Sequence, residues 1–223
     1  MEPQLVINIV SFSGKRCTGK TTALEMMKAH LGNVEECAFA YRVKTASARK
    51  MCDGQVVNLS YEQVLEKLLH DREFKELHRH LMIEIGNGER AKDPNIWVSQ
   101  TCSEIQSLIN NLQLFHSTGQ FYFCITDMRF KNEYNYVKNF FSNLSAIFKS
   151  TPMSAAVLNV HFFRLSSSDD VRISRGWKYD PKVDGDVSEC DLDDFETCCP
   201  DMKEIHNNST PLEFYENLYD FLC

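Results

Sequence analysis

Two kinds of hydrophobic pattern alternate along the chain. Short, nearly continuous apolar runs of strand length occupy residues 5–12, 121–126 and 157–165. Runs of this kind are typical of strands that are buried on both faces of a parallel sheet. Residues 37–43 and 202–205 also have strand character. The pattern therefore predicts five strands.

Between these runs the apolar residues recur at helical spacing. Leu24, Met27 and Leu31 share one face of a helix that is expected to stop at Gly32. The predicted helices cover residues 21–31, most of 45–113 with breaks near Gly54 and at Asp93-Pro94, 134–148, and 211–222. The segment 166–196, rich in Asp and Ser, lies between the third apolar run and the last strand.

Strands that alternate with helices predict an α/β fold in three layers, with a central parallel sheet. Ligands of such sheets bind beyond the carboxyl ends of the strands. A length of 223 residues without an internal repeat or a long linker suits one domain spanning residues 1–223. We expect no partner to be needed for stability, and hence a monomer.

Composition narrows the class of protein. Hydrophobic residues make up 43% of the chain and charged residues 25%, and the net charge is −7. These values exclude a disordered chain, and the negative charge disfavours a nucleic-acid binder. No apolar run approaches the roughly 20 residues of a membrane-spanning helix. Nine cysteines without a C-x-x-C pair, and a start at residues 1–4 without a basic region, favour free thiols and a cytoplasmic location.

A phosphate-binding loop is the strongest local signal. Residues 14–21 read Gly-Lys-Arg-Cys-Thr-Gly-Lys-Thr, which fits G-x-x-x-x-G-K-[ST] between the first strand and the first helix. Gly14 and Gly19 would let the backbone amides turn toward phosphate oxygens, and Lys20 would bridge the β- and γ-phosphates of ATP. The Thr21 hydroxyl would hold Mg²⁺, and Thr22 would reach the α-phosphate. The loop over residues 14–22 also includes Lys15, Arg16, Cys17 and Thr18.

Further charged residues follow the other predicted strands. Asp127 comes after an apolar strand, where it would hold the water around Mg²⁺ or cap a helix, and Arg129 would reach the same crevice or pair at the surface. Arg172 and Arg175 lie three residues apart, so on a helix they would face one side and close over the transferring phosphoryl group as a lid. The acidic run from Asp180 to Asp194 provides a solvated face or the lid's counter-charge.

The chain resembles the animal-type phosphomevalonate kinases, a P-loop family of the nucleoside-monophosphate-kinase type. The most specific stretch is Arg175-Gly176-Trp177 followed by Pro181-Lys182-Val183-Asp184, Ser188-Glu189-Cys190-Asp191-Leu192-Asp193 and Phe195. Other similar stretches are 12–16, 89–94, 126–129 and 205–207. The resemblance covers nearly the whole chain, with its motifs in order.

This resemblance implies transfer of the γ-phosphoryl group of ATP to (R)-5-phosphomevalonate, a small-molecule substrate, giving 5-diphosphomevalonate and ADP. Residues 15–22 would hold ATP, and Asn207 and Asn208 would lie near substrate and nucleotide. A helical region over about 45–95 would bind the acceptor, and a lid would cover about 166–185. The catalytic residues would be Lys20, Arg129, Arg172 and Arg175, and the cations that hold the acceptor or the transferring group would be Arg16, Arg79, Arg90, Arg129 and Arg164.

The sequence departs from the family pattern at several positions. Thr21 stands where the family has Asp, Phe130 replaces the second Arg of a D-T-R-R run, and Ser99 replaces another Arg. The S-G-P-L-K pattern is absent from residues 44–50, so the sequence does not place a substrate lysine there. Two alternatives therefore remain open: a deoxynucleoside-monophosphate kinase and a non-catalytic nucleotide-binding relative.

Overall fold

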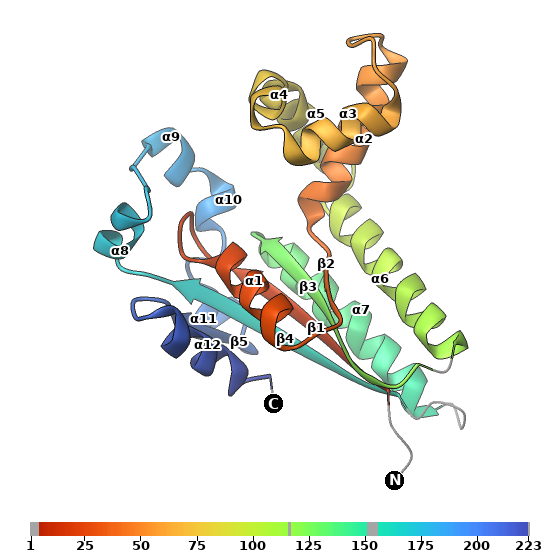
Figure 1. The fold of residues 1–223 in the computed structure, drawn as a ribbon, viewed down its shortest axis with the longest axis vertical. Coiled ribbons are helices and arrows are strands. Elements are labelled where there is room, and N and C mark those ends of the chain that lie inside the picture. The colour runs from red at the N-terminus through yellow and green to blue at the C-terminus, as the bar shows by residue number, and fades with distance from the viewer. Residues whose placement is uncertain (1–4, 116, 151–155, 223) are drawn as a thin grey trace.

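A computed structural model describes residues 5–115, 117–150 and 156–222. Its centre is a five-stranded parallel sheet in the order β2-β3-β1-β4-β5 (Figure 1). The strands are β1 (Leu5–Ser13), β2 (Val34–Glu36), β3 (Gly119–Met128), β4 (Ala156–Ser166) and β5 (Met202–His206). The predicted α/β class with a parallel sheet is confirmed. The N-terminal residues 1–4 and Cys223, which entered the sequence-based expectations, lie outside the described residues.

Helices cover both faces of the sheet, as the three-layer prediction requires. One face packs against α6 (Ile96–Leu114) and α7 (Lys131–Ser150). The other packs against α1 (Lys20–His30) and α12 (Pro211–Tyr219). Neighbouring β1 residues point to opposite faces, so Ile9 belongs to the first core and Val10 to the second. Both are fully buried, which accounts for the continuous apolar run in the sequence.

Two further groups of helices stand at the carboxyl edge of the sheet (Figure 1). The first contains α2 (Phe39–Asp53), α3 (Tyr61–His70), α4 (Arg72–Leu77) and α5 (Arg79–Lys92), and has its own small core of Ala48, Met51, Val64 and Leu68. The second contains the short α8 (Asp169–Ser174), α9 (Pro181–Asp184), α10 (Val187–Cys190) and α11 (Phe195–Cys198). The two groups contain most of the segments predicted as the acceptor-binding region and the lid.

The strand predicted over residues 37–43 is wrong. The strand β2 ends at Glu36, and Phe39 already begins α2. The reason lies far along the chain: the Asp127 carboxylate accepts hydrogen bonds from the backbone N–H groups of Phe39 and Ala40, each at 2.8 Å. A carboxylate on these exposed N–H groups stabilises a helix N-terminus, so tertiary structure overrides the local strand pattern.

The other predicted elements are found within a few residues of their expected ends. The eight cysteines in the described ranges are free thiols. Across those same ranges, no helix is both long enough and apolar enough to cross a membrane.

Candidate functional site

The phosphate loop has the backbone shape that its glycines predict. Gly14 has a φ of +144° and Gly19 a φ of +101°, both in the region that favours glycine. A Cβ atom at Gly14 would lie 2.4 Å from the Leu165 carbonyl oxygen, and one at Gly19 would lie 2.1 Å from Asn207 Nδ2. Backbone therefore excludes a side chain at Gly14, whereas at Gly19 the positive φ and the contact of Asn207 with the loop favour glycine. Gly19 immediately precedes α1, so the loop ends at a helix N-terminus.

Lys20 lies inside this loop. Its Nζ donates hydrogen bonds to the carbonyl oxygens of Gly14, at 2.5 Å, and Lys15, at 2.9 Å. Burial lowers the pKa of Lys20 to about 8, and the nearby Arg129 and Arg164 cations add to this effect. A lysine in this environment favours an anion beside it, because an added negative charge would offset both the burial and the repulsion.

A cavity of about 530 Å³ opens beside the loop. Its lining is shared by the loop, the segment predicted as the lid, the residue after β5, and α12: Cys17, Gly19, Lys20, Thr21, Thr22, Arg175, Asn207, Pro211 and Phe214. Sequence reasoning missed Pro211 and Phe214, because on a predicted closing helix they had only core signals. They give the cavity an apolar wall in addition to the cationic loop.

Both lid arginines point at the loop. Arg172 is buried, donates from Nε to the Arg16 carbonyl oxygen at 3.0 Å, and lies over the Trp177 ring at 3.8 Å from its centre. Arg175 donates to the Cys17 carbonyl oxygen at 3.4 Å and, through Nη2, to the Asn207 side-chain oxygen at 3.0 Å. The predicted arrangement, with both guanidiniums on one side, is therefore present.

The two asparagines lie where the lid, β5 and the loop meet. Asn207 Nδ2 donates to the Thr18 carbonyl oxygen at 3.0 Å, and the residue is buried. Asn208 accepts the backbone N–H of Ser168 at 2.7 Å, just before α8. Asn207 therefore touches the loop directly, whereas Asn208 fixes the start of the lid.

Arg129 and Arg164 reach the loop from β3 and β4. Arg164 is buried and donates to the Ser13 hydroxyl and to Asp193, each at 2.9 Å. Arg129 forms an ion pair with Glu189. Part of the acidic run is therefore counter-charge to these cations, whereas Asp180, Asp186 and Asp194 are exposed, so both readings of the sequence apply to part of the run.

Asp127 lies near Lys20, close enough that its charge raises the Lys20 pKa in part. Burial raises the pKa of Asp127 itself, although the two N–H groups of α2 act against that change. Of the two roles that the sequence left open for Asp127, the structure shows the capping role. The helix that it caps is α2, which precedes Asp127 in the chain. In the described parts of the chain, no group of three or more His, Cys, Asp or Glu forms a metal cluster.

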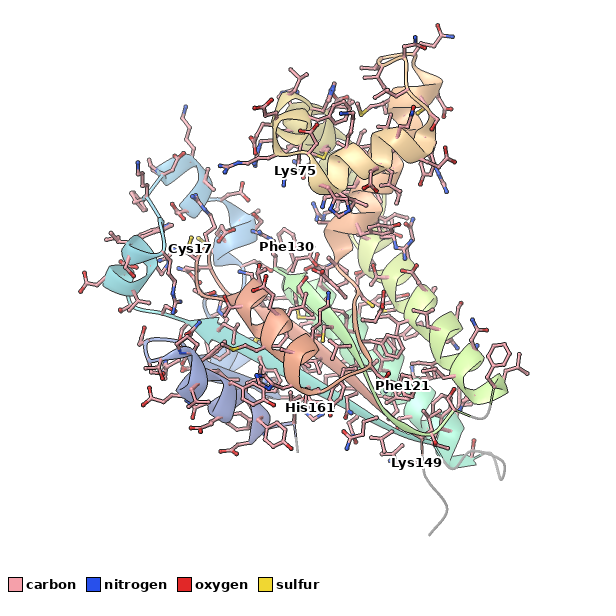
Figure 2. All side chains as sticks on the ribbon, viewed as in Figure 1. Cys17, Lys75, Phe121, Phe130, Lys149 and His161 are labelled. Atoms are coloured by element: carbon pink, nitrogen blue, oxygen red, sulfur yellow. The ribbon has the colours of Figure 1, made fainter. Side chains whose placement is uncertain are left out.

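The sequence suggested two acceptor cations on the helical group, and the structure places them in different surroundings. Arg79 pairs with Glu76 at the exposed start of α5. Arg90 lies over the Phe130 ring, 5.3 Å from its centre. Figure 2 shows Cys17 and Phe130 at the carboxyl edge of the sheet and Lys75 across from them. Phe130 thus contacts one of the predicted acceptor cations.

Two lysines were missed by sequence reasoning. Lys44 on α2 and Lys75 on α4 are half-buried, and within the described residues neither has a hydrogen bond or ion pair. Burial lowers the pKa of Lys44, and the Lys75 cation lowers it further. Their separation along the chain hides their proximity, which arises from the packing of α2 to α5.

Known proteins resemble this chain in sequence. A sequence model of the family described as "Phosphomevalonate kinase" matches residues 12–143. A Drosophila melanogaster protein named phosphomevalonate kinase is 28% identical over 191 residues, covering 85% of this chain and 83% of its own.

Solved structures also resemble the chain at low sequence identity. Dephospho-CoA kinase from Campylobacter jejuni has a TM-score of 0.41 and 12% identity, over 97% of this chain and 94% of its own. TT1252 from Thermus thermophilus has a TM-score of 0.42 and 14% identity, over 99% of this chain and 97% of its own.

Proposed function

Because the chain belongs to the phosphomevalonate kinase family, and is thus a kinase that uses ATP, we propose that it transfers the γ-phosphoryl group to (R)-5-phosphomevalonate, giving 5-diphosphomevalonate and ADP. One observation carries this proposal. The loop that contains Lys20 faces arginines from two strands and from the lid: Arg129, Arg164, Arg172 and Arg175. Such a cluster of cations at a phosphate loop suits the charge of a transferring phosphoryl group.

The nucleotide would lie in the cavity beside α1 and α12. Loop amides from Lys15 to Thr22, with Lys20, would hold its phosphates. The apolar wall of Pro211 and Phe214 would hold the nucleoside, and Asn207 and Asn208 would keep the lid at the loop.

Mg²⁺ fits the oxygen donors at this position. Thr21 lies in the lining of the cavity, so its hydroxyl would hold the ion. Both Asp127 oxygens accept N–H groups of α2, so this carboxylate would act on the ion's water rather than as a direct ligand. When bound, the ion would neutralise charge on the β- and γ-phosphates.

The acceptor would enter between the loop and the α2–α5 helices. Arg90 lies over the Phe130 ring, and in the described chain it forms no ion pair, although its charge acts on the nearby Glu133. With Lys44 and Lys75 it offers unpaired positive charge for a phosphate and a carboxylate. Arg16, Arg129 and Arg164 would meet the transferring group, whereas the exposed Arg79 would act at the edge.

No covalent intermediate and no general base are required, because the acceptor phosphate is already anionic. The enzyme needs to bring two anions together and to exclude water, which closure of a lid over residues 166–185 would do. We propose one domain over residues 1–223, acting as a monomer. The free thiols support a cytoplasmic location.

The test is ADP release from ATP and Mg²⁺ with 5-phosphomevalonate, beside a panel of nucleoside monophosphates. Strong stimulation by phosphomevalonate alone is expected. Stimulation by a nucleoside monophosphate alone would indicate a nucleoside-monophosphate kinase instead. This control is necessary because Phe130 and Ser99 replace arginines of the family. ATP binding without stimulation by any acceptor would indicate a non-catalytic relative.

A further inference from the structure

The acidic segment 184–194 folds over the phosphate loop instead of extending into solvent. Each of four carboxylates joins the segment to another part of the site. Asp184 pairs with Arg16 at 3.6 Å, Glu189 with Arg129, and Asp193 with Lys15 at 2.8 Å, while Asp191 accepts the Lys131 backbone N–H at 2.8 Å. The loop's cations are therefore met by carboxylates of this chain before any substrate binds.

Glu189 is the most enclosed of these carboxylates, with 5% of its side chain exposed. Its Oε2 accepts the backbone N–H of Arg16 at 3.2 Å, inside the phosphate loop. Its Oε1 forms the ion pair with Arg129, whose other contact is a 3.5 Å hydrogen bond to the Ser188 carbonyl oxygen. Arg129 is 38% exposed, and among the described residues Glu189 is the carboxylate that forms an ion pair with its guanidinium. The direction of Arg129 thus depends on Glu189.

Asp193 likewise forms ion pairs with two cations of the site, Arg164 and Lys15. Its Oδ1 lies 2.9 Å from Arg164 Nη2, and its Oδ2 lies 2.8 Å from Lys15 Nζ. Arg164 belongs to β4 and Lys15 to the loop, so one carboxylate joins two elements that a phosphate would otherwise have to bring together. Arg164 also donates to the Ser13 hydroxyl and lies 6.0 Å from the centre of the Phe195 ring, and these contacts leave part of its planar N–H array unused.

The carboxylates offset the repulsion between the cations of the site. Lys20 lies among cations that already lower its pKa, and Arg129 and Arg164 are two of them. Without nearby negative charge the partly exposed Arg129 side chain would turn outward to water, where charges are better solvated, and the buried Arg164 would carry an unpaired charge. The ion pairs with Glu189 and Asp193 hold the two guanidinium groups in place. The N–H groups that these pairs do not use remain available for a phosphate.

We propose that Glu189 and Asp193 are positioning residues for phosphoryl transfer, which hold Arg129 and Arg164 in the direction the transferring group requires. This inference rests on the proposed function, because it assigns the arginines to that group. The carboxylates act through the arginines and do not themselves contact the substrate. Their effect is therefore on turnover more than on nucleotide binding.

The test compares Glu189→Gln and Asp193→Asn with the unchanged protein and with Asp194→Asn. Glutamine and asparagine keep the size and an acceptor oxygen but remove the charge. Asp194 belongs to the same segment and pairs with Lys131 at the surface, 2.8 Å away, so it is a matched control. We expect a fall in kcat of about 10–100-fold for Glu189→Gln and Asp193→Asn, with a change of less than about threefold in the KM for ATP, and no change for Asp194→Asn.

A double-mutant cycle separates positioning from a structural role. If Glu189 acts through Arg129, its replacement should cost little further turnover in an Arg129→Gln background. Independent, multiplicative losses would overturn the proposal, as would tighter nucleotide binding by Glu189→Gln, since that would make the carboxylate a competitor of phosphate. Thermal melts identify a variant that fails to fold, and Glu189→Asp, which keeps the charge, then takes its place in the cycle.

Failure of the proposed function has a different signature. In that case the unchanged protein releases no ADP with phosphomevalonate. The cycle is then run on turnover with whichever acceptor in the panel is active or, if none is, on the slow hydrolysis of ATP by water. Non-additive losses there support the positioning role, and additive losses overturn it.

Discussion

On the lid side of the sheet edge, positively charged side chains lie against carboxylates: Lys15 against Asp193 and Arg129 against Glu189. On the side of α2 to α5, Lys44 and Lys75 have no such partner among the described residues, and Arg90 lies on an aromatic ring. The first set is held in place before a substrate arrives. Burial lowers the pKa of Lys44 in the second set, and the Lys75 cation lowers it further, while the Asp127 and Glu36 charges offset part of the change.

This difference suits two tasks. Phosphoryl transfer depends on geometry, so the cations around the γ-phosphate benefit from fixed directions. Acceptor capture depends on attraction, and unpaired, half-buried cations gain most from a bound anion. We therefore expect changes on the lid side to alter kcat, and changes on the helical side to alter the KM for the acceptor.

Lys20→Ala should have the largest effect, because it removes the charge at the centre of the loop. We expect turnover to fall by at least about 10²–10³-fold while the fold persists. Steady-state ADP release gives the rate, and circular dichroism gives the fold. Lys28→Ala on the same helix is the matched control, since Lys28 is half-exposed and lies 3.9 Å from Glu36 on the sheet edge. Near-full activity of Lys20→Ala would contradict the assignment of the loop.

The loop could be predicted from sequence because its features are local. Gly14, Gly19 and Lys20 are close in sequence, and the strand before them and the helix after them each have a clear hydrophobic period. Such a strand–loop–helix unit forms nearly the same way in any surrounding. The parallel sheet and both of its helical layers follow from the same kind of local signal.

Contacts between distant residues could not be predicted in this way. The local pattern of residues 37–43 predicted a strand. These residues instead begin α2, because the N–H groups at its start are bound by Asp127, which is far along the chain. Lys44 and Lys75 become neighbours through the packing of four helices. The acidic run had an evident charge, but only the folded chain shows which cation each carboxylate meets. Sequence therefore reveals the nucleotide side better than the acceptor side.

Glu133 lies at the boundary between the two sides and offers a test through pH. It is buried at the start of α7 and accepts the backbone N–H groups of Arg129, at 2.8 Å, and Phe130, at 3.1 Å. Burial raises its pKa from 4.5 to about 7. Between pH 4.5 and pH 7 the folded state keeps a proton that the unfolded state has lost. The stabilisation from the protonated Glu133 is therefore complete below pH 4.5, and it is lost as pH rises through 7.

This loss amounts to about 3 kcal/mol at 1.36 kcal/mol for each tenfold change in proton affinity. Glu133→Gln keeps an acceptor oxygen for both N–H groups but has no proton to lose. Urea unfolding from pH 5 to pH 8 should therefore show a fall in stability of the unchanged protein that is absent from Glu133→Gln. Glu213→Gln, at the exposed cap of α12, is the control: the pKa of Glu213 is lowered, so its contribution is already complete above 4.5 and stays constant from pH 5 to pH 8. Equal slopes for the unchanged protein and Glu133→Gln would refute the assignment.

Phe130→Leu should have the smallest effect, and it tests the helical side directly. Leucine keeps apolar volume but removes the ring that lies 5.3 Å from Arg90. A cation over an aromatic ring gains about 0.5–2 kcal/mol. Losing that support should let the Arg90 guanidinium turn away, so the KM for the acceptor should rise by up to about tenfold, with kcat and the KM for ATP nearly unchanged.

Phe130→Tyr keeps the ring and should keep the acceptor KM, so it is the control for Phe130→Leu. In an Arg90→Ala background, Phe130→Leu should have no further effect, because the ring then has no guanidinium to support. A fall in kcat with an unchanged acceptor KM would place Phe130 with the lid-side residues instead. That result would break the division between a side that fixes the γ-phosphate and a side that attracts the acceptor, since an aromatic contact on the helical side would then govern the transfer step itself.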